Sequence, residues 1–125
     1  MEKTFRRMKS SLDERNAYVT AEITTALAHQ IRALRIQRGL TQAELAKRMG
    51  TKQHVISRLE DPSYGRLSLN TLLQLSRAFD TGLQVQFVPF VGMLRDTFEP
   101  NADARLVPSF DEEMSGAGDA GISRS

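Results

Sequence analysis

The chain of 125 residues contains no cysteine and no tryptophan, and it has only 2 histidines. The absence of cysteine excludes disulfide bonds, thiolate catalysis and every cysteine-ligated zinc site. His29 and His54 are 25 positions apart, and neither lies in a His-Glu-x-x-His pattern. We therefore expect no metal ion and no cofactor in this protein.

Long apolar runs are also missing, since no stretch approaches the roughly 20 residues needed to cross a bilayer. The first residues, MEKTFRRMKSSLDERN, lack the apolar centre of a secretory signal, so we expect a cytoplasmic protein with no membrane partner. The sequence also has no paired carboxylates at a cleft-forming spacing, no nucleophile–base pair and no phosphate-cradling glycine loop. We expect that it is not an enzyme.

The net charge of +2 conceals an uneven distribution along the chain. Residues 1–77 contain 14 Lys and Arg against 7 Asp and Glu, whereas residues 78–125 contain 3 against 8. A basic region followed by an acidic one is typical of a domain that binds a polyanion, although an arginine-rich solvated surface has the same composition.

Residues 1–10 are basic and aperiodic, and we expect them to form a mobile arm. Ser11 and Glu14 have the spacing of a capping box, which predicts that a helix begins there. From Thr20 onward one helical face is apolar, and Gly39 supplies a left-handed stop. The residues of that face are Ile23, Leu27, Ile31 and Leu34.

Three further helices are predicted from their caps. Thr41 begins a second capping box, so a helix is expected over residues 42–49 before Gly50 ends it. Thr51 is expected to cap the next helix, which runs to about Glu60. After the turn segment DPSYGR, Ser68 is expected to cap a fourth helix. Apolar residues surround most of that helix, which predicts burial between its neighbours.

Residues 83–88 alternate apolar and polar side chains, as a half-buried strand does. A single strand has no partner within the chain, so we expect it to pair with the same strand of a second copy in a homodimer. The alternative is an extended segment lying over its own helices.

The sequence patterns that predict helices and strands become weaker after Phe90. Residues 91–94 are expected to form a turn, and residues from about 109 onward are expected to be unfolded. The predicted organisation is therefore an arm and short helix at 1–19, a core with its dimerisation strand at 20–90, and an acidic, largely disordered tail at 91–125.

The stretch TQAELAKRMGTKQHVISRLE, residues 41–60, divides its side chains between two roles. Its inward positions are apolar or small, as a close crossing of two helices requires. The positions left pointing outward from the second of these helices are all polar, namely Lys52, Gln53, His54, Ser57 and Arg58.

From about Ile31 to Phe79, and most of all over RIQRGLTQAELAKRMGTKQHVISRLE, the sequence resembles the XRE-like family of phage repressor and Cro-type helix-turn-helix regulators. The resemblance implies a mainly α fold, a repressor-like bundle of four to five helices whose third helix enters the DNA major groove. It also implies that Arg35 and Glu60 form a structural pair.

The resemblance implies which side chains face DNA. Gln42 is expected to hold a phosphate, and Arg38 and Arg66 are candidates for further backbone contacts, as are Lys47 and Arg48. The residues expected nearest the bases or the adjoining backbone are Thr51, Lys52, Gln53, His54, Ser57 and Arg58.

The function expected from these features is sequence-specific binding of double-stranded DNA by a homodimeric repressor. HigA-like antitoxins of type II toxin–antitoxin pairs have the same short layout, and their partner is a ribonuclease-type toxin. Residues 1–22 or 90–114 would then hold the toxin. The alternative from another class is a protein-interaction module whose basic face binds no particular DNA sequence.

Overall fold

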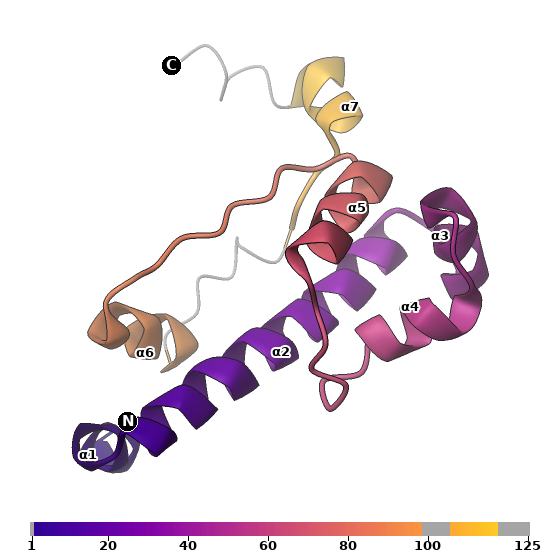
Figure 1. The fold of residues 1–125 in the computed structure, drawn as a ribbon. Coiled ribbons are helices and arrows are strands. Elements are labelled where there is room, and N and C mark those ends of the chain that lie inside the picture. Colours follow the sequence, from indigo (N-terminus) through magenta and orange to yellow (C-terminus); the bar gives the residue numbers. More distant parts are fainter. Residues whose placement is uncertain (1, 99–105, 118–125) are drawn as a thin grey trace.

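A computed structural model describes residues 2–98 and 106–117, which form a helical protein built along one long helix, α2 (Figure 1). The helix-turn-helix bundle predicted from the sequence lies at one end of α2, and a smaller group of helices lies at the other end. The helices are, in chain order, α1 (Glu2–Ser10), α2 (Leu12–Gln37), α3 (Gln42–Met49), α4 (Gln53–Leu59), α5 (Leu69–Phe79), α6 (Phe90–Phe98) and α7 (Phe110–Glu112).

Helix α2 begins where its capping residue predicts. The Ser11 side chain accepts a hydrogen bond from the backbone N–H of Glu14, at 3.2 Å. The helix ends at Arg38, and Gly39 follows with φ 69°, a left-handed conformation that glycine adopts without steric cost. Its 26 residues run without a break, so the boundary expected between residues 19 and 20 falls inside one continuous helix.

The main core lies between the C-terminal half of α2 and helices α3, α4 and α5. Leu45 and Ile56 are fully buried, and Phe79 is 2% exposed. Around them pack further apolar side chains from the same four helices, so a single cluster fixes how these helices cross. The buried members of the cluster are Ile31, Leu34, Leu45, Ala46, Ile56, Leu59, Leu75 and Phe79.

Helix α5 begins at its predicted cap, because the Ser68 hydroxyl accepts the backbone N–H of Thr71 at 3.1 Å. The expectation that α5 is buried between its neighbours is wrong for one side of the helix. Leu69 is 60% exposed and Leu73 is 45% exposed. The helix packs by one face only, because α2 and α3 contact it while no other described helix covers its outer side.

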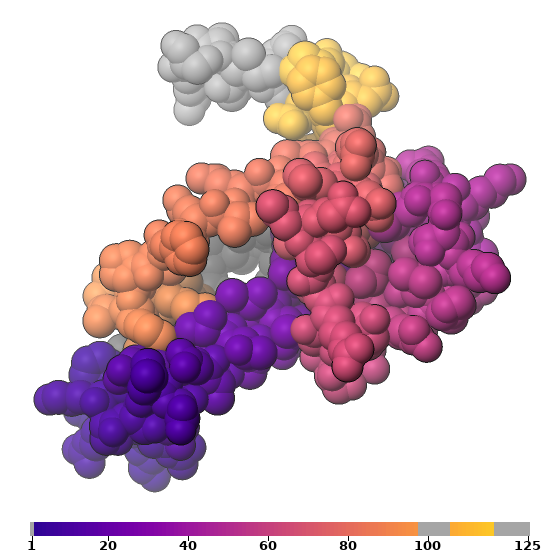
Figure 2. Space-filling view, in the orientation of Figure 1, coloured from indigo at the N-terminus to yellow at the C-terminus, as the bar shows by residue number. Residues whose placement is uncertain are grey.

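The predicted strand at residues 83–88 is not confirmed. The segment is extended, but no part of the described chain pairs with it. Figure 2 shows it crossing from α5 to α6 and standing clear of α2 over a hollow. Apolar and polar side chains of α2, α6 and this segment line a groove of about 450 Å³ there. A strand needs a hydrogen-bonded neighbour, and the part of the chain that the structure describes supplies none.

A satellite lobe forms at the N-terminal end of α2, and it consists of α1, α6 and the first half of α2. Residues 2–10 form helix α1, in place of the expected mobile arm. Residues 90–98 form helix α6, in place of the turn expected at residues 91–94. Met8 is 4% exposed and Leu94 is 2% exposed. The Tyr18 hydroxyl lies 2.6 Å from the Thr97 hydroxyl, which ties α2 to α6.

Residues 106–117 contradict the expectation of an unfolded end from residue 109 onward. The Ser109 side chain caps α7 by accepting the backbone N–H of Glu112, and a π-helical turn follows at Glu113–Ala117. The backbone N–H of Phe110 donates to Asp80 O at 2.8 Å. The segment is therefore attached to the C-terminal end of α5. The expectation for residues 118–125 lies outside the described residues.

The first prediction concerns the main core. Phe79→Ala is expected to lower the free energy of unfolding by about 3 to 5 kcal/mol, because it leaves a cavity where α2, α3 and α5 meet. Leu69→Ala, on the exposed side of α5, is the control and is expected to change it by about 0.5 kcal/mol or less. Urea denaturation followed by circular dichroism measures both, and equal effects would contradict the packing described.

Candidate nucleic-acid interface

Helix α4 has one buried edge and one exposed edge, as the sequence predicts. Ile56 and Leu59 point into the core, at 0% and 4% exposed. The other edge faces solvent and carries amide, imidazole, hydroxyl and guanidinium groups. A short helix with an apolar inner edge and an uninterrupted polar outer edge can offer hydrogen-bonding groups without weakening its packing. The exposed residues are Gln53, His54, Ser57 and Arg58, and Lys52 is exposed just before them.

The turn between α3 and α4 is built by the capping residues on either side of it. Thr41 and Glu44 complete a reciprocal capping box at the start of α3. Gly50 ends α3 with φ 70°, where a side chain would be strained. Ala46 lies under the crossing and is 3% exposed. Ala46 is therefore the small residue at the crossing, whereas Gly50 is needed for its left-handed backbone conformation, because a side chain there would contact nothing.

The predicted cap of α4 is one residue out of place. The backbone N–H of Thr51 donates to Ala46 O at 2.9 Å, so Thr51 still belongs to the end of α3. Lys52 therefore holds the N-cap position in an extended conformation, and it makes no side-chain capping bond. Thr51 itself is half-buried in the turn.

An ion pair between Arg35 on α2 and Glu60 at the end of α4 fixes the position of α4, as the sequence resemblance implies. Arg35 Nε donates to Glu60 Oε2 at 2.6 Å, and Nη2 donates to Oε1 at 3.1 Å. Their side chains are 13% and 5% exposed. Arg35 Nη1 also donates to the carbonyl oxygen of Leu40 at 2.9 Å. A bidentate pair of this kind fixes orientation as well as distance.

Gln42, at the first position of α3, joins the same network. Its amide Nε2 donates to Glu60 Oε1 at 3.3 Å, and the side chain is half-buried. Glu60 therefore holds the start of α3 and the end of α2 together with its own helix.

Hydrogen bonds shift the pKa of three groups in and beside these helices. The bonds from Arg35 to Glu60 raise the pKa of Arg35 above its already high ordinary value, and the guanidinium is always charged. The backbone N–H and hydroxyl of Thr41 lower the pKa of Glu44. The hydroxyl and backbone N–H of Ser63 lower the pKa of Asp61. All three groups keep their charges at neutral pH.

Tyr64 is a candidate that the sequence reasoning missed. It lies in the loop after α4, is 36% exposed, and has the guanidinium carbon of Arg58 6.0 Å from its ring centre. A cation over an aromatic face at this distance gains a modest attraction. The signal in the sequence is an aromatic residue within the polar turn DPSYGR. Arg66 is exposed in the same loop.

Comparison with protein families identifies the arrangement. A helix-turn-helix family model matches residues 31–86, a range that contains α3, α4 and α5. Residues 31–86 are a helix-turn-helix domain of the XRE-like family. The match supports a DNA-binding transcription regulator. Neither the comparison with curated proteins nor the comparison with solved structures gave a match.

Arg38 has a different position from the one predicted for it. It lies on the side of the helix-turn-helix domain where α2 and α5 end, and its Nε donates to Phe79 O at 2.9 Å. Nη1 donates to Val107 O at 2.7 Å, and Nη2 is buried without a partner. The side chain joins the C-terminal segment to the domain, so its guanidinium is not available to a phosphate.

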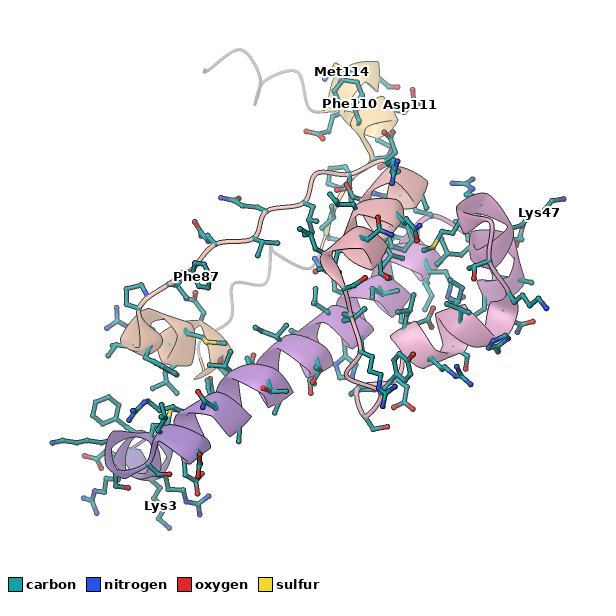
Figure 3. The ribbon with its side chains drawn as sticks, in the orientation of Figure 1. Lys3, Lys47, Phe87, Phe110, Asp111 and Met114 are labelled. Atoms are coloured by element: carbon teal, nitrogen blue, oxygen red, sulfur yellow. The ribbon has the colours of Figure 1, made fainter. Side chains whose placement is uncertain are left out.

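The two basic residues of α3 differ in the contacts of their charged groups. Arg48 Nη1 donates to Ala78 O at 3.3 Å and so links α3 to α5. Lys47 extends from the outer edge of the helix-turn-helix domain (Figure 3). Only Lys47 therefore keeps its charged group fully in solvent.

The described residues, 2–98 and 106–117, contain neither a cluster of metal-ligating side chains nor a membrane-crossing helix. In this part of the chain no three histidine, cysteine, aspartate or glutamate side chains come together as a metal site would require. No helix there combines the length and the apolar character of a membrane-crossing segment.

The second prediction concerns the ion pair. Glu60→Gln keeps the shape of the side chain but leaves the charge of Arg35 in a largely buried position without its counter-charge. We expect the free energy of unfolding to fall by about 3 kcal/mol. The control is Asp96→Asn, which removes an exposed carboxylate from α6. Thermal and urea denaturation measure both variants, and equal stability of the two would contradict the role given to Glu60.

Proposed function

We propose that this protein is a sequence-specific DNA-binding repressor that acts in the cytoplasm as a homodimer on a two-fold related operator. The observation that supports the proposal best is the unbroken polar edge of α4, held in place by the Arg35–Glu60 pair. In helix-turn-helix proteins the second helix of the motif enters the major groove and its exposed side chains contact base edges. Here that helix is α4.

The chemistry of the exposed side chains is suited to base recognition. The amide of Gln53 offers a donor beside an acceptor, as adenine N6 and N7 require. Lys52 can donate to guanine O6 or N7, and Arg58 to guanine or a phosphate. His54 and Ser57 add a donor or acceptor each. A good bidentate contact discriminates between bases by about 1 to 3 kcal/mol.

Groups at the rim of α4 are proposed to hold the DNA backbone. Gln42 has a second amide N–H beyond the one that it gives to Glu60, and that second N–H is assigned to a phosphate. Thr51 in the turn and Arg66 in the following loop are assigned to neighbouring phosphates, with Tyr64 as an added candidate. Arg38 is left out because its guanidinium is bound within the protein.

The homodimer is proposed to form through residues 83–88. Val85 is 71% exposed and Phe87 is fully exposed at 107%. The segment is extended, and no described segment pairs with its backbone. Pairing two copies antiparallel across a two-fold axis would satisfy those backbone groups and cover the apolar side chains. Two domains on one axis would then read half-sites about one DNA turn, roughly 34 Å, apart.

An antitoxin role is the narrower form of this proposal. The satellite lobe and the segment at residues 106–117 both lie apart from α4, so a toxin could be held while α4 faces DNA. The adjacent reading frame decides the question: a ribonuclease-type product that co-purifies with this protein supports the antitoxin form, and an unrelated product excludes it.

The third prediction tests the DNA-reading edge. We expect the Gln53→Ala and Lys52→Ala variants each to bind the DNA that the wild-type protein selects from random sequence about tenfold or more weakly than the wild type does. Each substitution removes a base contact. Both residues are exposed, so the thermal unfolding curves are expected to stay unchanged. Gln74→Ala, on the exposed side of α5, is the matched control and should bind as the wild type does.

Salt dependence gives a second measure of the same binding. Each neutralised phosphate contributes about −0.9 to the slope of log affinity against log salt concentration. Because a dimer is expected to neutralise several phosphates, we expect a slope below about −4. Binding that does not respond to salt, or equal affinities for Gln53→Ala and Gln74→Ala, would favour the protein-interaction alternative.

The fourth prediction tests the dimer. Val85→Asp would place two carboxylates close together across the proposed axis and remove an apolar contact. We expect a monomer at low micromolar concentration, measured by sedimentation velocity. Leu69→Asp changes an equally exposed apolar residue outside the segment, and it should leave a dimer. A wild-type monomer, or a dimer that survives Val85→Asp, would contradict this interface.

A further inference from the structure

Helix α1 is strongly basic, and nothing in the helix-turn-helix domain accounts for its charge. Its nine residues carry one acidic side chain, Glu2, against four basic ones. All four basic side chains are exposed, and none makes an ion pair within the described residues. They are Lys3, Arg6, Arg7 and Lys9.

The basic side chains of α1 belong to a helix that is packed against the rest of the protein. Met8 packs into the satellite lobe and is 4% exposed. Arg15 on α2 donates from Nη1 to the carbonyl oxygen of Met8 at 2.7 Å, which stabilises the C-terminal end of α1. Phe5 lies beside Val91 and Leu94 of α6 in a shared groove. A basic helix anchored in this way presents its cations in a set arrangement, which a solvated arm would not do.

The acidic side chains of residues 111–113 lie away from α1. The carboxylates of residues 111–113 belong to the segment around α7, which is attached to Asp80 at the end of α5. Figure 1 places α7 and α1 at opposite ends of the molecule. Glu2 on α1 and Asp13 and Glu14 at the start of α2 are the carboxylates nearest to α1 along the chain, and in the described part of the chain none of them forms an ion pair with its cations. Within the described residues the four cations of α1 are therefore exposed and without an ion-pair partner.

The length of α2 sets how far α1 lies from α4. At about 1.5 Å per residue, a helix of this length spans about 39 Å. The helix-turn-helix domain packs on its C-terminal half and α1 lies at its N-terminal end. Lys3 extends away from the body of the protein along the lower edge of Figure 3, the edge toward which the loop after α4 also points. One turn of DNA is about 34 Å long, which is close to that span.

We propose that α1 is a second DNA-contacting element, which binds the phosphodiester backbone about one helical turn from the bases that α4 of the same protomer faces. This inference rests on the proposed function. The exposed cations of α1 and its place at the opposite end of α2 from the helix-turn-helix domain support it. Because phosphate contacts bear no sequence information, α1 adds affinity and sets register while α4 supplies selectivity.

Two other polyanionic partners fit the structure less well. A membrane-surface helix needs a broad free apolar face, but Met8 is buried and Phe5, at 45% exposed, is the one large apolar side chain that α1 exposes. An acidic protein segment would also need several apolar contacts beside the charges, and α1 offers Phe5 alone. A regular array of phosphates requires only the spaced cations that α1 presents.

The fifth prediction tests this element with the full-length protein and the DNA that it selects. The variant Arg6→Gln/Arg7→Gln is expected to weaken binding at least about tenfold at 0.1 M salt. Its salt slope should be less negative by about 0.9 for each phosphate contact removed, hence by about 2 for a dimer that loses one contact in each α1. The affinity ratio between selected and scrambled DNA should stay unchanged. Phosphate-ethylation interference should be lost only at positions about one turn from each half-site.

The matched control is Arg32→Gln/Arg77→Gln, which removes two exposed cations from α2 and α5. A second pair on α1, Lys3→Gln/Lys9→Gln, guards against a folding defect in the first variant. A slope equal to that of the control, an unchanged interference pattern, or binding of α1 to anionic vesicles rather than DNA overturns this inference. If the wild type selects no sequence at all, the proposed function itself fails, and that result differs from selective binding that ignores α1.

Discussion

The bidentate pair between Arg35 and Glu60 is the constraint on which the arrangement of the helices at the DNA-facing end depends. Glu60 accepts from Arg35 on α2 and from Gln42 on α3, while Arg35 also holds the carbonyl oxygen of Leu40. Apolar packing is not directional and would tolerate several orientations of a seven-residue helix such as α4. Hydrogen bonds to a planar guanidinium are directional, so the pair selects one orientation.

The pair matters for function because base recognition depends on position. In the proposed function, side chains on α4 meet base edges within hydrogen-bonding distance, and a small rotation of the helix would move all of them together. Ala46 permits the close crossing of α3 and α4, Gly50 permits the turn between them, and the ion pair fixes the crossing angle. The satellite lobe shares α2 with this assembly, because α2 is one continuous helix from Leu12 to Gln37.

Local signals in the sequence were enough to predict the helix-turn-helix domain. Thr41, Ser68 and Gly50 mark helix ends by chemistry that operates within a few residues, and the structure confirms each of them. The apolar inner positions of α4 are likewise confirmed. Thr51 was misassigned because the end of α3 and the start of α4 compete for the same residues.

The regions beyond residues 31–86 could not be predicted in the same way. Helix α1 depends on one buried side chain, Met8, which gives no periodic pattern. The carbonyl oxygen of Pro89 accepts the first hydrogen bond of α6, since proline is tolerated where a helix begins. Arg38 looked like a free surface cation, and only the tertiary structure brings Val107 to it. The contact between Arg38 and Val107 joins residues 69 positions apart, which no local pattern in the sequence reveals.

The central claim is that α4, held by Arg35 and Glu60, reads the bases of a two-fold related DNA site. The most direct measurement is to select DNA from random sequence twice, once with the wild-type protein and once with Gln53→Ala. We expect the DNA selected by the wild type to contain an inverted repeat. The DNA selected by the variant should contain the same repeat, with the base preference lost at one position in each half-site. Identical motifs from the two proteins, or no enriched sequence for the wild type, would contradict it.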